Sequence, residues 1–307
     1  MHLLNALMGL IRWKKLIMIA AMQCIVKYAI ISPFKADYSL NNLSFFTLII
    51  ATCCIAAAGY IINDIHDVFA DKINKPQRLY INKVIPENTA YNLYFIFNAV
   101  GVALGFVVAN LVHKPGLSAI FIGATLINYM YTTTLKKYLL IGNIAVACLV
   151  SLTLVIVPLF ELYPSLDSTN KALHLLLFKV IFDYAIFAFL MTLIRELIKD
   201  LQDIKGDQVV GLKTTPIVLG IRNTKLLITV VTIITISGLA HYVYNYIYNY
   251  NLAVLYFLLT LLGPLIVFLI RLIKAKTSEE FFQLSKILKL IMIFGMLSLI
   301  LYPLVIL

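Results

Sequence analysis

Charged residues are scarce in this chain of 307 residues, since only 13% of them are Asp, Glu, Lys or Arg. Hydrophobic residues make up 62%, and the mean hydropathy of +0.96 is far above that of soluble domains. Few residues are left between the apolar stretches, which argues against a separate soluble domain. The composition therefore predicts an all-α protein that is integral to a membrane.

Cysteine is also rare, and no two of the four cysteines have the CxxC spacing of a metal or redox motif. Cys24, Cys53, Cys54 and Cys148 all fall inside apolar stretches. This placement predicts small packing residues and excludes a disulfide framework or a thiolate metal site.

Nine stretches are long and apolar enough to cross a bilayer, which takes about 20 residues. They lie near 14–33, 43–62, 90–112, 117–135, 139–160, 172–194, 223–241, 252–270 and 287–306. The first is too long for a cleavable signal peptide and lacks a small-residue cleavage site. We expect a single domain, residues 1–307, with nine transmembrane helices.

The 25 Lys and Arg residues fall mostly on one side of these nine spans. With a cytoplasmic N-terminus, the positive-inside rule is obeyed by all of them except Lys27, Lys35, Lys114, Lys171 and Lys179. The net charge of +11 is thus mainly a topology signal, and it gives no reason to expect a nucleic-acid partner. No protein partner is expected either.

The chain has only 14 Asp and Glu residues, and six of them form two segments with identical spacing. The first acidic trio is Asp64, Asp67 and Asp71; the second acidic trio is Asp200, Asp203 and Asp207. Positions i, i+3 and i+7 share one face of an α-helix, so each trio can act as a unit. One such cluster alone could also be a solvated, salt-bridged helix end. Because the same spacing occurs twice, at 63–71 and 200–207, we favour a functional role for both clusters.

Both trios belong to polar loops expected at 63–89 and 195–222, after the second and sixth spans, on the cytoplasmic side. This arrangement resembles two pseudo-repeated halves that contribute one half-site each. Carboxylates spaced in this way suit Mg²⁺, which prefers oxygen ligands and commonly binds substrate phosphates as well. Two Mg²⁺ ions with a basic rim predict a diphosphate ligand, and the lipid setting predicts that it carries a long apolar tail.

Several further residues are candidates with a simpler alternative. Arg78, Lys136 and Lys213 are expected to contact the diphosphate, although each alone is also an ordinary positive-inside residue. Asp183 lies within a span and is a functional candidate by that position, but an ion pair with Lys179 four residues earlier explains it better. The histidine between the first two aspartates, His66, is read as a non-ligand on another helical face.

These motifs resemble the UbiA superfamily of membrane prenyltransferases. Asn63-Asp64-x-x-Asp67-x-x-x-Asp71 is similar to the first aspartate-rich motif of that superfamily, and the second trio is similar to the second. The likeness extends to the nine spans and to a Tyr131-x-x-x-x-Lys136 element before the fifth span. Residues 12–23 and 195–220 are most similar to the ether-lipid branch, the digeranylgeranylglyceryl phosphate synthases. The chain departs from the superfamily after Arg78, where the usual Pro and Gly are missing, and near Lys15, which stands where an Asn is usual.

The resemblance implies a bundle whose central cavity opens to the cytoplasm. It also implies an Mg²⁺-dependent transferase that moves a polyprenyl group, with geranylgeranyl as the favoured group, from its diphosphate. The six aspartates are the implied catalytic and metal-binding residues. Asn63, Arg78, Tyr131, Lys136 and Lys213 are the implied contacts of the diphosphate or the prenyl group.

The acceptor is open at this point. In the ether-lipid reading it is geranylgeranylglyceryl phosphate, whose second phosphate needs basic contacts such as Lys14, Lys15 and the basic residues of 195–213. In the alternative reading it is an aromatic acid of quinone biosynthesis. A haem-modifying prenyltransferase and an ion-coupled transporter are more distant alternatives. Transporters place such acids near the membrane midplane, whereas the acids of this chain are expected at the cytoplasmic ends of the spans.

Overall fold

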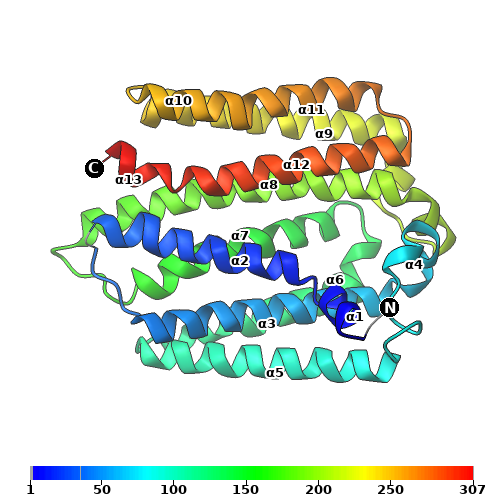
Figure 1. The fold of residues 1–307 in the computed structure, drawn as a ribbon, viewed down its shortest axis with the longest axis horizontal. Helices are drawn as coiled ribbons and strands as arrows, with labels where there is room; N and C mark the ends of the chain where they lie inside the picture. The colour runs from blue at the N-terminus through cyan, green and yellow to red at the C-terminus, as the bar shows by residue number, and fades with distance from the viewer. Residues whose placement is uncertain (1–2, 35, 307) are drawn as a thin grey trace.

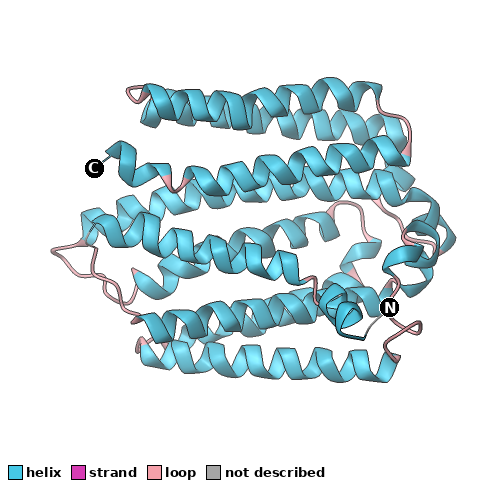
Figure 2. Cartoon of the chain, in the orientation of Figure 1, coloured by secondary structure: helices cyan, strands magenta, loops and turns pink. Residues whose placement is uncertain are grey.

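The computed structural model describes residues 3–34 and 36–306, without the side chains of Arg78 and residues 304–306. The described chain is a bundle of long helices joined by short loops (Figures 1 and 2). The α-helices are α1 (Leu3–Leu10), α2 (Trp13–Ile25), α3 (Asn42–His66), α4 (Val68–Asn74), α5 (Glu87–Leu111), α6 (Ala119–Thr133), α7 (Ile141–Glu161), α8 (Lys171–Val209), α9 (Thr215–Tyr242), α10 (Asn251–Phe257), α11 (Gly263–Lys274), α12 (Ser278–Ser298) and α13 (Leu301–Ile306).

Shorter helical turns extend or link these helices. The π-helical turns are η1 (Val26–Ile31), η6 (Val243–Ile247) and η7 (Leu258–Leu262). The 3₁₀ turns are η2 (Ser32–Phe34), η3 (Pro76–Arg78), η4 (Pro115–Ser118) and η5 (Leu135–Lys137). Because the π-turns continue the helices before them, α9 with η6 and α10 with η7 and α11 each form one membrane-length rod.

All nine stretches expected to be transmembrane are helical, and eight helices of the described chain are long and apolar enough to cross a membrane. The fourth stretch is the exception, because α6 has only 15 residues. At 1.5 Å per residue α6 is about 22 Å long, which is shorter than a bilayer core of about 30 Å. The η4 turn that precedes α6 lengthens this segment toward the required span.

Local sequence signals set several helix ends. Asn41 caps α3 by accepting a 2.9 Å hydrogen bond from the backbone N–H of Ser44. Thr277 and Glu280 form a capping box at the start of α12, where each side chain accepts from the other residue's backbone. Gly211, with φ of +71°, lies in the turn after α8, and Pro216 lies in the first turn of α9.

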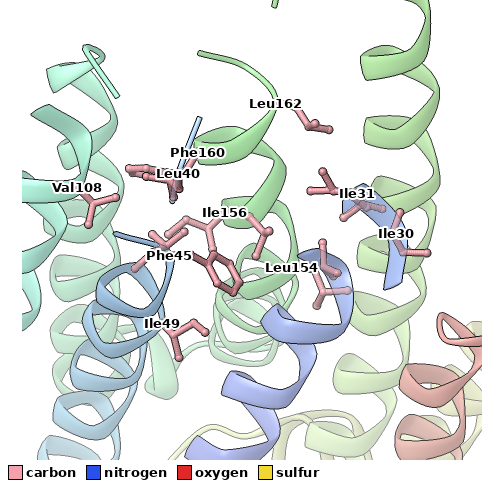
Figure 3. Packing of buried hydrophobic residues seen from close by; sticks show 14 of the residues in the cluster. Ile30, Ile31, Leu40, Phe45, Ile49, Val108, Leu154, Ile156, Phe160 and Leu162 are labelled. Carbon is pink, nitrogen blue, oxygen red and sulfur yellow. The ribbon is translucent and has the colours of Figure 1, made fainter. Parts of the chain in front are cut away.

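The helices are arranged in adjoining rows, with α9, α10 and α11 packed beside α8 and α12 (Figure 1). On the other side, α3 packs along α5, and α7 packs against α8. Figure 3 shows one apolar cluster in which side chains of η1, α3, α5 and α7 interlock. Its labelled members include Ile30, Phe45, Val108 and Phe160, all of which are completely buried. This cluster joins η1, α3, α5, α6, α7 and the first half of α8, at the end of the bundle far from the acidic trios.

The loop expected at 195–222 is largely helical instead. Helix α8 runs for 39 residues, about 58 Å, and therefore extends well beyond the bilayer core. Only residues 210–214 separate it from α9. The reason is that no Pro or Gly interrupts 195–205, so the helix continues until Gly211 can adopt a positive φ.

The cysteines agree with the expectation from the sequence, whereas the pairing of Lys179 does not. The four cysteines are free, as expected from their spacing. The expected ion pair between Lys179 and Asp183 is wrong: no such pair lies within 4.0 Å in the described structure, and the Lys179 ammonium donates a 2.9 Å hydrogen bond to the Tyr246 hydroxyl. The alternative partner comes from η6, a turn that the spacing along α8 could not reveal.

Candidate active site

The first acidic trio lies where α3 ends and α4 begins. Asp64 is in the last turn of α3, Asp71 is on α4, and Asp67 is the junction residue, with φ of −93° and ψ of 5°. The expected single helical face is therefore interrupted at Asp67. The amide of Asn63 donates a 2.9 Å hydrogen bond to Asp67 Oδ2, which holds one carboxylate oxygen in place.

Each of the first two aspartates is paired with a cation from a distant segment. Arg12 Nη2 lies 2.5 Å from Asp64 Oδ1, and the ammonium of Lys136 pairs with Asp67 Oδ1. Arg12 reaches this position because its backbone adopts a left-handed conformation, φ 53°, between α1 and α2. Two segments that are distant in the sequence therefore converge on the first trio.

The second acidic trio lies on the extended end of α8. Asp200 Oδ2 accepts a 2.9 Å hydrogen bond from the amide of Asn143 on α7. Asp203 pairs with the ammonium of Lys75, which follows α4. Asp207 is buried, with 6% of its surface exposed. The carboxylates of α8 are thus oriented by α7 and by the segment that carries the first trio.

A close contact between α4 and α8 brings the two trios together. The side chain of Asn74 donates to the backbone carbonyl of Asp203 and accepts from the N–H of Gly206, each at 2.9 Å. A Cβ atom at position 206 would lie 2.7 Å from the carbonyl oxygen of Ala70 and would also clash with the Asn74 amide. Gly206 therefore permits an approach that any side chain would prevent.

Lys136 lies between the two trios and interacts electrostatically with Asp67, Asp200 and Asp207. Burial acts to lower the pKa of its ammonium, but the neighbouring Asp67 carboxylate outweighs burial, and the pKa is raised. Lys136 therefore stays positively charged at physiological pH.

Burial has the opposite consequence for Asp71. It raises the pKa of Asp71 to about 6, and the nearby charges of Asp67 and Asp64 act in the same direction, while Lys75 and Lys136 partly offset them. The carboxylates of the first trio are thus crowded enough to disfavour one another's charge. A divalent cation would relieve this repulsion.

The donor chemistry of the site fits Mg²⁺, although the geometry is that of ion pairs. Among the described residues, no three His, Cys, Asp or Glu side chains are grouped closely enough to hold a metal by themselves. However, Asp203 Oδ1 is buried without a hydrogen-bond partner, so it is an acceptor that a cation could satisfy. Because Mg²⁺ sites often combine one or two carboxylates with substrate phosphates and water, a protein cluster of three ligands is not required.

Of the other residues considered for the site from the sequence, Tyr131 lies near the trios, whereas Lys213 and His66 are exposed. Tyr131 on α6 is partly buried near Lys136, Asp67 and Asp200, so it lies between the trios. Lys213 is exposed in the turn after α8, and within the described structure it makes no ion pair with either trio. The side chain of Arg78 lies outside the described residues. His66 is exposed, and among the described residues no hydrogen bond or ion pair joins it to the aspartates.

Four residues that contact the trios were not expected as site residues: Arg12, Asn74, Lys75 and Asn143. Arg12 and Lys75 were read only as topology signals, because their charges fit the positive-inside rule. Asn143 carried a usable signal, since a polar amide in an otherwise apolar membrane helix needs a hydrogen-bond partner. Nothing in the sequence around Asn74 indicated that it contacts the second trio.

Known proteins resemble this chain over most of its length. Residues 24–304 match the UbiA prenyltransferase family. Over 261 residues the chain is 29% identical to the digeranylgeranylglyceryl phosphate synthase of Methanosphaera stadtmanae, and the match covers 82% of this chain and 86% of that protein.

Solved structures share the fold. A structure of digeranylgeranylglyceryl phosphate synthase in membranes has a TM-score of 0.64 at 24% identity, with 99% of both chains covered. A UbiA homolog from Archaeoglobus fulgidus bound to GPP and Mg²⁺ has a TM-score of 0.57 at 15% identity, with 96% of this chain and 99% of that chain covered. At these identities the structures establish a common helical bundle. Since the family match spans nearly the whole chain, this multi-pass membrane enzyme belongs to the UbiA prenyltransferase family.

Proposed function

We propose that this enzyme transfers a geranylgeranyl group from its diphosphate to the free hydroxyl of geranylgeranylglyceryl phosphate, in an Mg²⁺-dependent reaction of ether-lipid synthesis. The observation that carries the proposal is the convergence of both acidic trios on Lys136 through the contact between α4 and α8. The match to the Methanosphaera synthase supports the choice of substrates.

Two Mg²⁺ ions fit this site, one on each trio. The first would be held by carboxylates among Asp64, Asp67 and Asp71, with Asn63, and the second by carboxylates of the trio on α8, with substrate phosphates completing each set of ligands. The A. fulgidus structure with GPP and Mg²⁺ supports this use of the fold. When bound, the ions supply positive charge that stabilises the leaving diphosphate. Each of the two halves of the chain thereby contributes one half-site.

Cationic side chains complete the diphosphate site. Lys136 is placed between the trios, where it can donate to the oxygen on which negative charge develops as the allylic C–O bond breaks. Arg78 and Lys213 are further diphosphate contacts in this proposal. Lys75 and Arg12 pair with Asp203 and Asp64, and they would be available to bind phosphate if cations neutralised these carboxylates.

The reaction replaces one C–O bond with another. The bond between the prenyl carbon and the diphosphate breaks, the acceptor hydroxyl oxygen bonds to that carbon, and the hydroxyl proton leaves. The ring of Tyr131, between the trios, can stabilise the allylic cation through its face. Apolar helices around the tail exclude water that would otherwise capture that cation.

The membrane orientation follows from the charge pattern. The helix ends and loops that carry the trios lie at the end of the bundle that holds α1 and α4 (Figure 1), and by sequence most Lys and Arg residues belong to the loops of this side. By the positive-inside rule this end faces the cytoplasm, where the diphosphate and the acceptor phosphate are soluble. The lipid bilayer holds the prenyl tails.

The test is product formation by purified enzyme in detergent or nanodiscs, with geranylgeranyl diphosphate and either geranylgeranylglyceryl phosphate or an aromatic acid. We expect ether product with Mg²⁺ and none after chelation. Asp67→Asn and Asp203→Asn are expected to lose activity by roughly 10²-fold or more, since each removes charge from one metal site. Asp37→Asn, an exposed aspartate outside both trios, is the matched control. Product only with the aromatic acid refutes the proposed acceptor, and full activity of both trio variants refutes the two-metal site.

A further inference from the structure

A second group of cations lies one helical turn deeper than the aspartates. On α3, Tyr60 is four residues before Asp64, a rise of about 6 Å. The guanidinium of Arg12 and the ammonium of Lys15 both lie over the Tyr60 ring, at 4.9 and 4.8 Å from its centroid. The ring thus holds two cations from α2 and the turn before it close together.

Helix α8 supplies the other side of this group. Arg195 and Glu196 precede Asp200 by about one to one and a half turns. Lys199 comes directly before Asp200 and pairs with Glu196. Lys15 is within electrostatic range of Arg12, Lys199, Arg195 and Glu196. We define the cationic layer as Arg12, Lys15, Arg195 and Lys199.

The charges of the cationic layer are not balanced by the protein. Asp64 pairs with Arg12 and Glu196 pairs with Lys199. Lys15 and Arg195 have no carboxylate within 4.0 Å in the part of the chain that the structure describes. In addition, Arg195 Nε is buried without an acceptor. Grouping cations in this way is unfavourable unless an anion binds among them.

We infer that the cationic layer, through Lys15 and Arg195, binds the phosphate monoester of the acceptor lipid. This inference rests on the proposed function. In the proposed function the diphosphate would be bound by Lys136 and by ions on the two trios, about one turn away. In geranylgeranylglyceryl phosphate, four bonds of roughly 1.5 Å separate the attacking hydroxyl oxygen from phosphorus, so they can lie no more than about 6 Å apart. A hydroxyl beside the diphosphate therefore places its phosphate within reach of the cationic layer.

The test compares Lys15→Gln and Arg195→Gln with the wild-type enzyme on two acceptors, geranylgeranylglyceryl phosphate and the same lipid without its phosphate. With the phosphorylated acceptor, each variant is expected to raise the acceptor KM roughly tenfold or more, because a charge-assisted hydrogen bond to phosphate is lost. The KM for geranylgeranyl diphosphate is expected to stay within about twofold. With the phosphate-free acceptor, variants and wild type are expected to have equal kcat/KM.

Two controls separate this role from a structural one. Lys286→Gln changes an exposed lysine of α12 that lies over the Phe282 ring and belongs to neither trio nor the cationic layer, and it is expected to leave both KM values unchanged. Lys15→Arg keeps the charge and is expected to restore most of the acceptor affinity. A binding measurement adds a readout besides turnover: the phosphorylated acceptor is expected to raise the thermal unfolding midpoint of the wild type more than that of Lys15→Gln.

The kinetic results separate a failure of the cationic layer from a failure of the proposed function. A parallel rise in the KM for the diphosphate, or an equal loss with the phosphate-free acceptor, refutes the assignment of the cationic layer while the proposed function stands. If the wild-type enzyme makes no product from geranylgeranylglyceryl phosphate, the proposed function fails and this inference fails with it.

Discussion

Lys27 and Glu161 form an ion pair with an N–O distance of 2.7 Å, and only 1% and 0% of their side chains are exposed. The pair joins η1 to the end of α7, at the end of the bundle far from the acidic trios. Both groups also bond to Leu40, since Lys27 donates to its carbonyl at 2.8 Å and its N–H donates to Glu161 at 3.2 Å. Phe45 adds a ring 4.5 Å from the Lys27 ammonium. The one lysine of the first span that departs from the positive-inside pattern is therefore a structural residue.

Removing one partner of this pair is expected to destabilise the fold. Lys27→Met leaves a buried carboxylate without its cation, which costs about 3–5 kcal/mol. Adding Glu161→Gln removes the stranded charge and is expected to recover much of that loss, because the Gln amide can still serve Leu40. Thermal unfolding in detergent measures both variants. Equal midpoints for Lys27→Met and wild type contradict the structural role.

Lys136 is expected to matter for chemistry more than for stability. Lys136→Gln removes a charge placed between the trios and is expected to lower kcat by roughly 10²-fold, with a smaller change in the KM for the diphosphate. The matched control is Lys137→Gln, since Lys137 is adjacent in η5 but exposed. A similar loss of kcat in Lys136→Gln and Lys137→Gln would contradict a specific catalytic role for Lys136, and would indicate that both lysines act only as positive-inside residues.

Gly206 is expected to tolerate no side chain. Gly206→Val places atoms against the Ala70 carbonyl and the Asn74 amide, and it is expected to separate α4 from α8 and abolish most activity. Gly123→Ala on α6 is the control, because a Cβ atom there meets no other atom within 4 Å. Activity and the unfolding midpoint are measured together; loss of activity with an unchanged midpoint would locate the effect in the alignment of the trios.

Asn143 is expected to tune metal affinity through Asp200. Asn143→Ala removes the 2.9 Å hydrogen bond that orients this carboxylate, and such outer partners are worth roughly 10–100-fold in metal affinity. The Mg²⁺ concentration for half-maximal activity should rise by about that factor, while activity at saturating Mg²⁺ recovers. Asn110→Ala serves as the control, because the Asn110 amide donates to the Phe106 carbonyl within its own helix. An unchanged Mg²⁺ dependence contradicts a role for Asp200 in metal binding.

The helices and the acidic residues were readable from the chain because both depend on local pattern. Apolar runs of bilayer length specified nine helical stretches, and the repeated spacing of Asp64, Asp67 and Asp71 at 200–207 singled out six of the scarce acids. Periodicity acts within a few turns of one helix, so it needs no knowledge of neighbours. The same local reading predicted free cysteines correctly.

Contacts between distant segments were decided only by the tertiary structure. Arg12 with Asp64, Lys75 with Asp203 and Asn143 with Asp200 join residues 52, 128 and 57 positions apart, and nothing in their spacing predicts such partners. The same packing leaves Lys213 exposed and gives Lys179 a tyrosine instead of Asp183. Hydropathy and spacing therefore determined the class of fold and the acids, whereas helix packing chose which cations face them, because those choices depend on which faces of separate helices meet.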